Sequence, residues 1–181
     1  MNEPSVFSGP EMTVPRDLLV SISISNYTFH LRLFNLQHFG NVENREIHNI
    51  YGLLMTTSTF NGLVKHRPNL RPFILTRSFY AGSQRTAAVW TGDNMSKWEH
   101  LKISIAMLLS HSVTGITFIG ADIAGFFFNP ESEELVIRWY QASVFHPFMR
   151  AHAHIETKRR EPWLFSEFAR NTIRDGKHQW I

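Results

Sequence analysis

Residues 71–94 read RPFILTRSFYAGSQRTAAVWTGDN and contain two short apolar runs that each end in polar groups. The run FIL is followed by TRS, which includes Arg77, and the run AAVW is followed by TGDN, which includes Asp93. A third run, GITFI at 115–119, leads into Gly-Ala-Asp and ends at Asp122. Apolar strands with charged C-terminal ends are typical of a parallel α/β barrel with a top-face active site. The alternative is three core strands followed by ordinary turn residues. One cation and two carboxylates at successive strand ends weigh against it.

Helical patterns separate these runs, as expected for a parallel sheet. The spacing of apolar residues predicts a helix over 45–65. Ser96, followed three residues later by Glu99, has the pattern of a capping box and predicts a helix that runs to residue 110. A third helix is predicted to start at 129–131. The residues expected to face the core are Leu101, Ile105, Leu108 and Leu109 in the second helix, and Leu135, Trp139 and Tyr140 in the third.

The composition excludes several classes of protein. The chain has 181 residues, of which 43% are hydrophobic and 18% charged, as expected for a globular core and not for disorder. No apolar stretch reaches the roughly 18 residues of a membrane span. The formal net charge of +3 comes from scattered basic residues, so no nucleic-acid partner is expected. There is no cysteine, which excludes disulfides and thiolate metal sites.

Six motifs carry a resemblance to a known family: MNEPSVF, LTRSFYAGSQ, VWTGDN, GADIAGF, RAHAH and KRREPW. Together they resemble the glycoside hydrolase family 31 α-glucosidases, most closely the glucosidase II type, over residues 1–15 and 40–168. The resemblance implies an α/β fold. Because 181 residues fall short of the ~250 of a full barrel, we expect residues 1–181 to be a partial catalytic domain. It would be the C-terminal half of a (β/α)8 TIM barrel, from the end of strand four to strand eight.

Two stretches do not follow the family. Residues 16–39 are expected to be an insertion, such as the read-through of a retained intron; the alternative is a genuine lineage-specific loop. Within this stretch 18–25 alternates apolar and polar residues and predicts a strand, and 30–34 continues the pattern. Residues 169–181 are expected to be a divergent tail.

Retaining cleavage of a glycosidic bond needs two carboxyl groups about 5–5.5 Å apart. By resemblance, Asp93 is the acid/base residue, which must hold a proton near neutral pH and later accept one from water. From the spacing alone, Asp93 in the sequence Gly-Asp-Asn would be interpreted as an ordinary turn residue with no catalytic role. The family's nucleophilic aspartate would directly precede Met1. Glu3 would then be a supporting carboxylate beside it, and this chain alone is expected to be inactive.

The remaining site residues are also assigned by resemblance. Arg77 would contact the glucose in the −1 subsite, Asp122 and His152 would bind its hydroxyls, and Trp90 and Phe126 would be stacking walls. Taken alone, either aromatic residue is more often part of a core. His152 and His154, spaced i, i+2, suggest a metal site, but no third ligand accompanies them at a persuasive spacing. We expect no metal and no cofactor.

The implied function is hydrolysis of terminal α-linked glucose, with trimming of N-glycans in the endoplasmic reticulum lumen beside a non-catalytic β subunit. Two alternatives stay open. One is a general α-glucosidase that acts on maltose-like glucans. The other is an inactive truncated product that lacks the nucleophile and persists as a partner-binding decoy.

Overall fold

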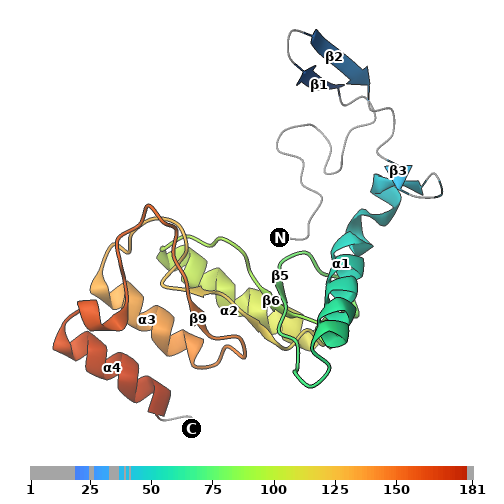
Figure 1. Cartoon of the computed structure of the whole chain (residues 1–181). Coiled ribbons are helices and arrows are strands. Elements are labelled where there is room, and N and C mark those ends of the chain that lie inside the picture. The colour runs from blue at the N-terminus through green and yellow to red at the C-terminus, as the bar shows by residue number, and fades with distance from the viewer. Residues whose placement is uncertain (1–18, 25–26, 33–36, 39, 41, 179–181) are drawn as a thin grey trace.

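The computed structural model describes residues 19–24, 27–32, 37–38, 40 and 42–178. Figure 1 shows the elements in chain order. They are β1 (Leu19–Ile24), β2 (Tyr27–Arg32), β3 (Gln37–His38), β4 (Val42–Glu43), α1 (Asn44–His66), β5 (Leu75–Thr76), η1 (Ser83–Arg85), β6 (Ala88–Trp90), α2 (Trp98–Val113), β7 (Ile119–Gly120), β8 (Asp122–Ile123), α3 (Glu133–Ser143), β9 (Arg150–Ala151), η2 (Pro162–Leu164) and α4 (Glu167–His178).

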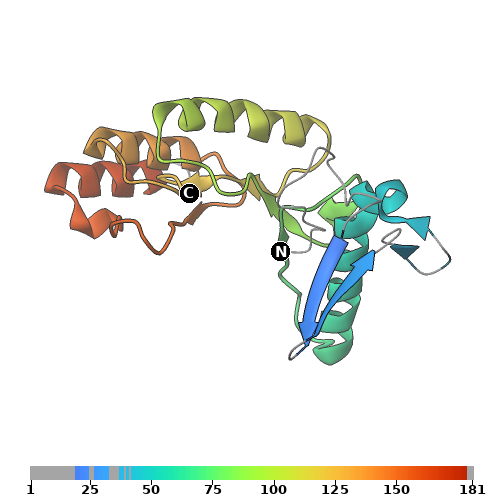
Figure 2. The same cartoon turned by 90° about the horizontal axis from the view of Figure 1, so that it is seen from above.

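The predicted strand–helix alternation is confirmed from β5 to β9. Strands β5, β6 and β7 form a parallel sheet in that order, and β8 pairs in parallel with β9. Parallel neighbours need a crossover connection, and helix α2 provides one between β6 and β7, as α3 does between β8 and β9. In Figure 2 these helices and α4 lie along one side of the strands. The charged side chains that follow β5 and β6 are therefore carried to one end of the sheet.

The core lies between these strands and the helices. Val89, Ile119 and Ile123 come from the strands and are at most 1% exposed, and Trp139 of α3 is fully buried. Branched and aromatic side chains of this kind suit the pleated surface of a buried sheet. The inward positions predicted for α3 are all confirmed, since Leu135 and Tyr140 are buried as well.

Two details of the helix predictions are wrong. Helix α2 begins at Trp98 after Lys97, and no side chain caps its first turn. Ser96 instead follows Met95, which forms a β-bridge with Phe127, and the Ser96 N–H donates to the Phe127 carbonyl at 2.8 Å. Helix α3 begins at Glu133 because Ser132 caps it, its hydroxyl accepting from the Leu135 N–H at 3.2 Å.

The buried stripe of α2 is narrower than predicted. Leu101 and Leu108 are buried, together with Ser104 between them, whereas Ile105 and Leu109 are 48% and 61% exposed. Positions 101, 104 and 108 share one helical face, and that face meets the sheet. The adjoining face that carries Ile105 and Leu109 is not covered by the described residues.

The N-terminal part contains α1 and a hairpin. Helix α1 spans the residues predicted to be helical, with one further residue at each end. Strands β1 and β2 form an antiparallel hairpin with Leu19 opposite Arg32, so the strand predicted from alternation at 18–25 is confirmed over its described residues, 19–24. Figure 1 shows the hairpin well away from the parallel sheet. Among the described helices, none combines the length and apolar character needed to cross a membrane.

Gly120 in β7 allows a close approach that no other residue would permit. A Cβ atom at this position would lie 1.7 Å from the Phe148 carbonyl oxygen. We expect Gly120→Ala to lower the free energy of unfolding of the protein by about 1–3 kcal/mol, the range for overpacking. The control is Gly62→Ala in α1, where nothing lies within 4 Å; it should stabilise the helix by up to about 1 kcal/mol. Denaturant titration of both variants checks this, and an unaffected Gly120→Ala variant would contradict it.

Candidate functional site

The site begins with an ion pair between two strand ends. Arg77 follows β5 and Asp93 follows β6, and Arg77 Nη1 lies 3.2 Å from Asp93 Oδ2. Both side chains are about one-third exposed or less, at 28% and 32%. Gly92, with φ of +83°, turns the chain between β6 and Asp93, and a side chain there would meet that of Arg77. The structure thus brings together two of the residues predicted for the site.

A second ion pair lies at the next strands. Asp122, the first residue of β8, is 1% exposed, and its Oδ1 accepts from Arg150 Nη2 at 2.6 Å. The two residues are opposite one another in the β8–β9 register. The other oxygen, Oδ2, is buried and accepts no hydrogen bond from the described part of the chain. Since a buried carboxylate oxygen without a donor is costly, Oδ2 is suited to accept from a ligand hydroxyl.

The electrostatics of Asp122 connect the two pairs. Burial raises the pKa of the Asp122 carboxyl above its ordinary value, because the charged form loses its hydration. The hydrogen bond and positive charge of Arg150 act in the opposite sense, as does His152, whereas the charge of Asp93 raises the pKa further. The negative charge of Asp93 therefore acts on the carboxyl group of Asp122 and connects the two ion pairs electrostatically.

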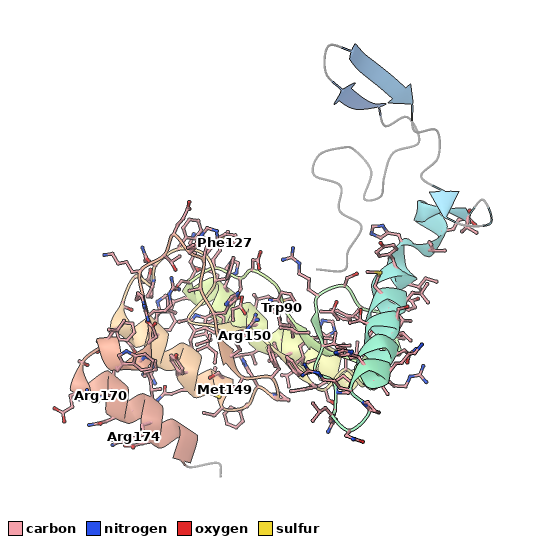
Figure 3. All side chains as sticks on the ribbon, in the orientation of Figure 1. Trp90, Phe127, Met149, Arg150, Arg170 and Arg174 are labelled. Atoms are coloured by element: carbon pink, nitrogen blue, oxygen red, sulfur yellow. The ribbon has the colours of Figure 1, made fainter. Side chains whose placement is uncertain are left out.

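Arg150 is a candidate site residue that the sequence analysis missed. Its guanidinium lies 5.4 Å from the ring centroids of both Trp90 and Phe148, in addition to its contact with Asp122. Figure 3 shows Trp90 and Arg150 close together in the middle of the molecule. A buried aspartate needs a cation nearby, and that requirement together with the RAHAH motif is the signal that could have identified Arg150. Trp90 itself is 8% exposed.

The loop between β8 and α3 carries Phe126, which packs against residues that follow β9. Its ring lies 5.0 Å from the His152 ring and 5.5 Å from the His154 ring, while Phe127 lies 5.3 Å from His154. His154 N–H also donates to the Phe126 carbonyl at 2.9 Å. The structure therefore brings Phe126 and His152 together. It places Trp90 in a separate group with Arg150.

Asn94, next to Asp93, joins the end of β6 to this loop. Its carbonyl accepts from the N–H groups of Phe126 and Phe127 at 2.7 and 3.0 Å, and its side-chain amide donates to the Asp122 carbonyl at 3.0 Å. These bonds fix the position of the residue beside Asp93. Sequence reasoning also missed this junction, because the partners lie about 30 residues away in the chain.

Two hollows border these residues. One of 230 Å³ lies beside Asp93 and includes His100, whose Nδ1 accepts from the Met95 N–H at 3.0 Å. The other is formed by residues 151–155 and 157–161, with both histidines of the RAHAH motif in its lining. Within the described ranges, no three His, Cys, Asp or Glu side chains are grouped as a metal site would require. Glu3 lies outside the described residues.

Comparison with known proteins gives consistent matches. The profile described as "Glycosyl hydrolases family 31 TIM-barrel domain" matches residues 1–177. The chain is 51% identical over 179 residues to the "Probable glucan 1,3-alpha-glucosidase" of Oryza sativa subsp. japonica, covering 98% of this chain and 17% of that protein. It is 50% identical over 177 residues to the "Glucosidase 2 subunit alpha" of Saccharomyces cerevisiae, covering 97% of this chain and 17% of the yeast protein.

Solved structures match over the same extent. The glucosidase II alpha subunit bound to "alpha3-Glc2" superposes with a TM-score of 0.81 and 44% sequence identity, over 99% of this chain and 18% of that one. The same values apply to the endoplasmic-reticulum glucosidase II heterodimer of catalytic subunit and regulatory-subunit binding domain. The chain therefore spans less than one-fifth of the length of the proteins that it matches.

Proposed function

Because the chain belongs to the glycosyl hydrolase family 31 TIM-barrel domain, we propose that it forms the C-terminal half of a (β/α)8 barrel in an α-glucosidase. This half would run from the end of strand four to strand eight. The parallel order β5-β6-β7 and the parallel pair β8–β9, with α2 and α3 as crossovers, support this proposal. The relatives with about 50% identity include proteins named α-glucosidases, which are glycosyl hydrolases.

The single observation that carries the proposed activity is the meeting of charged groups from three strand ends. Arg77 and Asp93 form an ion pair at 3.2 Å, and Asp93 acts electrostatically on the buried Asp122. Retaining glycoside hydrolysis uses two carboxyl groups, and the C-terminal ends of parallel strands, where Asp93 lies, are where barrel enzymes carry their catalytic residues. Asp93 is the proposed acid/base residue. Glu3 is the proposed supporting carboxylate. It would lie beside the nucleophilic aspartate, which in the family directly precedes the residue that matches Met1.

The other residues would bind the terminal glucose. Asp122 would accept from a hydroxyl through its unpartnered Oδ2, and Arg77 would contact the sugar from the end of β5. His152 and Phe126 are already in contact and would form one side of the subsite. Trp90 would form a wall beneath Arg150. No metal or cofactor is needed for this chemistry.

The proposed substrate is an α1,3-linked glucose, as on an N-glycan, in the endoplasmic reticulum lumen and beside a non-catalytic β subunit. The name of the rice relative and the ligand named for the solved structure support the linkage. The heterodimeric structure supports the partner. Residues 16–39, which include the β1–β2 hairpin, are proposed to be an insertion, and residues 169–181 a divergent tail. An inactive product remains the alternative for the isolated chain.

The test uses a chimeric subunit in which residues 1–181 replace the matching segment of the Saccharomyces cerevisiae relative. We expect it to cleave nigerose, which is α1,3-linked, in preference to α1,4-linked maltose. Proton NMR should show α-glucose released first, as retention requires. The isolated 181-residue chain should show no turnover. Preference for maltose would favour the general α-glucosidase, release of β-glucose would exclude retention, and an inactive chimera would contradict the proposed function.

A further inference from the structure

Arg160 is a buried cation that belongs to neither of the ion pairs described above. The residue is 6% exposed. Its Nη1 donates to the carbonyl oxygens of Ala124 and Gly125, both at 2.9 Å, and its Nη2 donates to that of Phe128 at 2.6 Å. The three acceptors lie 32 to 36 residues earlier in the chain. Arg160 therefore holds both ends of the loop 124–128 with one planar group.

The loop 124–128 has a conformation that its own sequence disfavours. Ala124 and Phe128 have φ of 67° and 64°, in the left-handed region that residues with a side chain rarely adopt. Gly125, with φ of +83°, passes so close to Ser96 that a Cβ atom would lie 2.4 Å from its backbone. Such strain persists only where the surrounding structure over-determines the conformation. Three charge-assisted hydrogen bonds from one guanidinium provide that constraint.

The same loop links the parts of the candidate site. Phe126 N–H donates to the Asn94 carbonyl beside Asp93, and Gly125 N–H donates to the Asp122 carbonyl. On the other side the Phe126 carbonyl accepts from His154, and the Phe126 ring lies against His152. A shift of the loop would therefore move all of these contacts at once.

We propose that Arg160 is a positioning residue of the glycosidase site: it holds the loop 124–128 in its strained conformation and thereby aligns Phe126, Asn94 and Asp122 for the sugar. This inference rests on the proposed function. The guanidinium is required because its Nη1 donates to the Ala124 carbonyl at one end of the loop and its Nη2 donates to the Phe128 carbonyl at the other end. A lysine ammonium is a single point charge and reaches only one end.

Arg160→Lys and Arg160→Met in the chimeric subunit test this role, with Arg138→Met as the control. Arg138 lies on α3, is 53% exposed and forms an ion pair with Glu134. A displacement of about 1 Å in a positioned group can cost roughly 10²-fold in rate. We expect kcat/KM for nigerose to fall about 10- to 100-fold in both Arg160 variants and to stay unchanged in Arg138→Met.

Active-site titration separates positioning from folding. A cyclitol epoxide that alkylates the nucleophile counts the functional sites, so that kcat/KM can be expressed per active site. If Arg160 only stabilises the fold, its variants will lose titratable sites and thermal stability, and each remaining site will work at the parental rate. That result would overturn the proposal. The dissociation constant for deoxynojirimycin, a ligand named for one of the solved structures, should rise in parallel with the loss of kcat/KM.

A second variant keeps the test decisive if Arg160→Met does not fold. Glycine adopts a positive φ without strain, so Ala124→Gly in the Arg160→Lys background should recover most of the lost kcat/KM per site. No recovery would overturn the proposal. Hydrogen exchange at the amides of Phe126 and Phe127 gives a readout that needs no activity. These amides should exchange faster in Arg160→Lys. Unchanged exchange would show that Arg160 does not hold the loop 124–128, and this readout applies even if the chimera has no glucosidase activity.

Discussion

Replacing Asp93 with alanine in the chimeric subunit is expected to slow cleavage of nigerose by about 10²–10⁴-fold, the usual contribution of a general acid–base group. In the proposed mechanism the leaving sugar oxygen takes a proton from Asp93 as the C–O bond breaks. From a glycosyl fluoride, fluoride departs without that proton, so this substrate should still glycosylate the nucleophile. The structure supports the assignment, since Asp93 lies at the end of β6 beside Arg77.

The second half of the reaction gives an independent signature. Asp93 would remove a proton from the water that hydrolyses the covalent intermediate, so the intermediate should accumulate in Asp93→Ala and be visible by mass spectrometry. Azide needs no deprotonation and should release it as the α-glycosyl azide. Glu99→Ala in the first turn of α2 is the matched control and should behave as the parent. If both substrates slow equally and azide restores nothing, Asp93 is a structural or sugar-binding residue.

Arg150→Met is expected to have the second large effect. Asp122 is 1% exposed and would lose the cation at 2.6 Å from its Oδ1. Removing one partner of a buried pair leaves an uncompensated charge, and we expect the free energy of unfolding to fall by about 3 kcal/mol at neutral pH, the low end of the usual range, because Arg150 is partly exposed. The exposed pair between Arg138 and Glu134 is the control, and Arg138→Met should cost only about 0.3–0.5 kcal/mol.

The sign of the pH dependence follows from the pKa of Asp122. Burial already raises this pKa, and Arg150 limits the rise. Without Arg150 the pKa rises further, so the native state of the variant binds a proton that the unfolded state has lost. The stability deficit of Arg150→Met should therefore be largest at neutral pH and shrink as the pH falls through the raised pKa. Urea titrations across this range check the trend; a deficit independent of pH would mean that Arg150 acts through packing on Trp90.

Local patterns predicted the elements of this fold well. Helix α1, the strands β5, β6 and β7 and the inward face of α3 all follow from apolar runs and their periods. The errors occur where a distant segment decides the outcome. Ser96 does not cap α2, because the residue at the N-cap position is Lys97 and the bond from the Ser96 N–H to the Phe127 carbonyl holds Ser96 outside the helix. Ile105 is exposed because the sheet covers only the neighbouring face of α2.

The same distinction applies to the candidate site. Charges at strand ends indicated Arg77, Asp93 and Asp122 without any structure, because parallel strands bring their C-terminal ends to one edge. Arg150 and Arg160 could not be found in this way. Their partners lie 28 or more residues away in the chain. The spacing of apolar residues within one helix or strand gives no information about such a distant contact.

The junction at Asn94 bears on how enzymes with this frame can diversify. Phe126 and Phe127 are held to Asn94 through their N–H groups, and Phe126 is held to His154 through its carbonyl. All of these bonds use main-chain atoms of the loop, so the side chain at position 127, which has no proposed role in binding the glucose, can be exchanged while the bonds persist. Substitutions at this position can therefore change the surface beside the candidate site without moving Phe126 or Asn94.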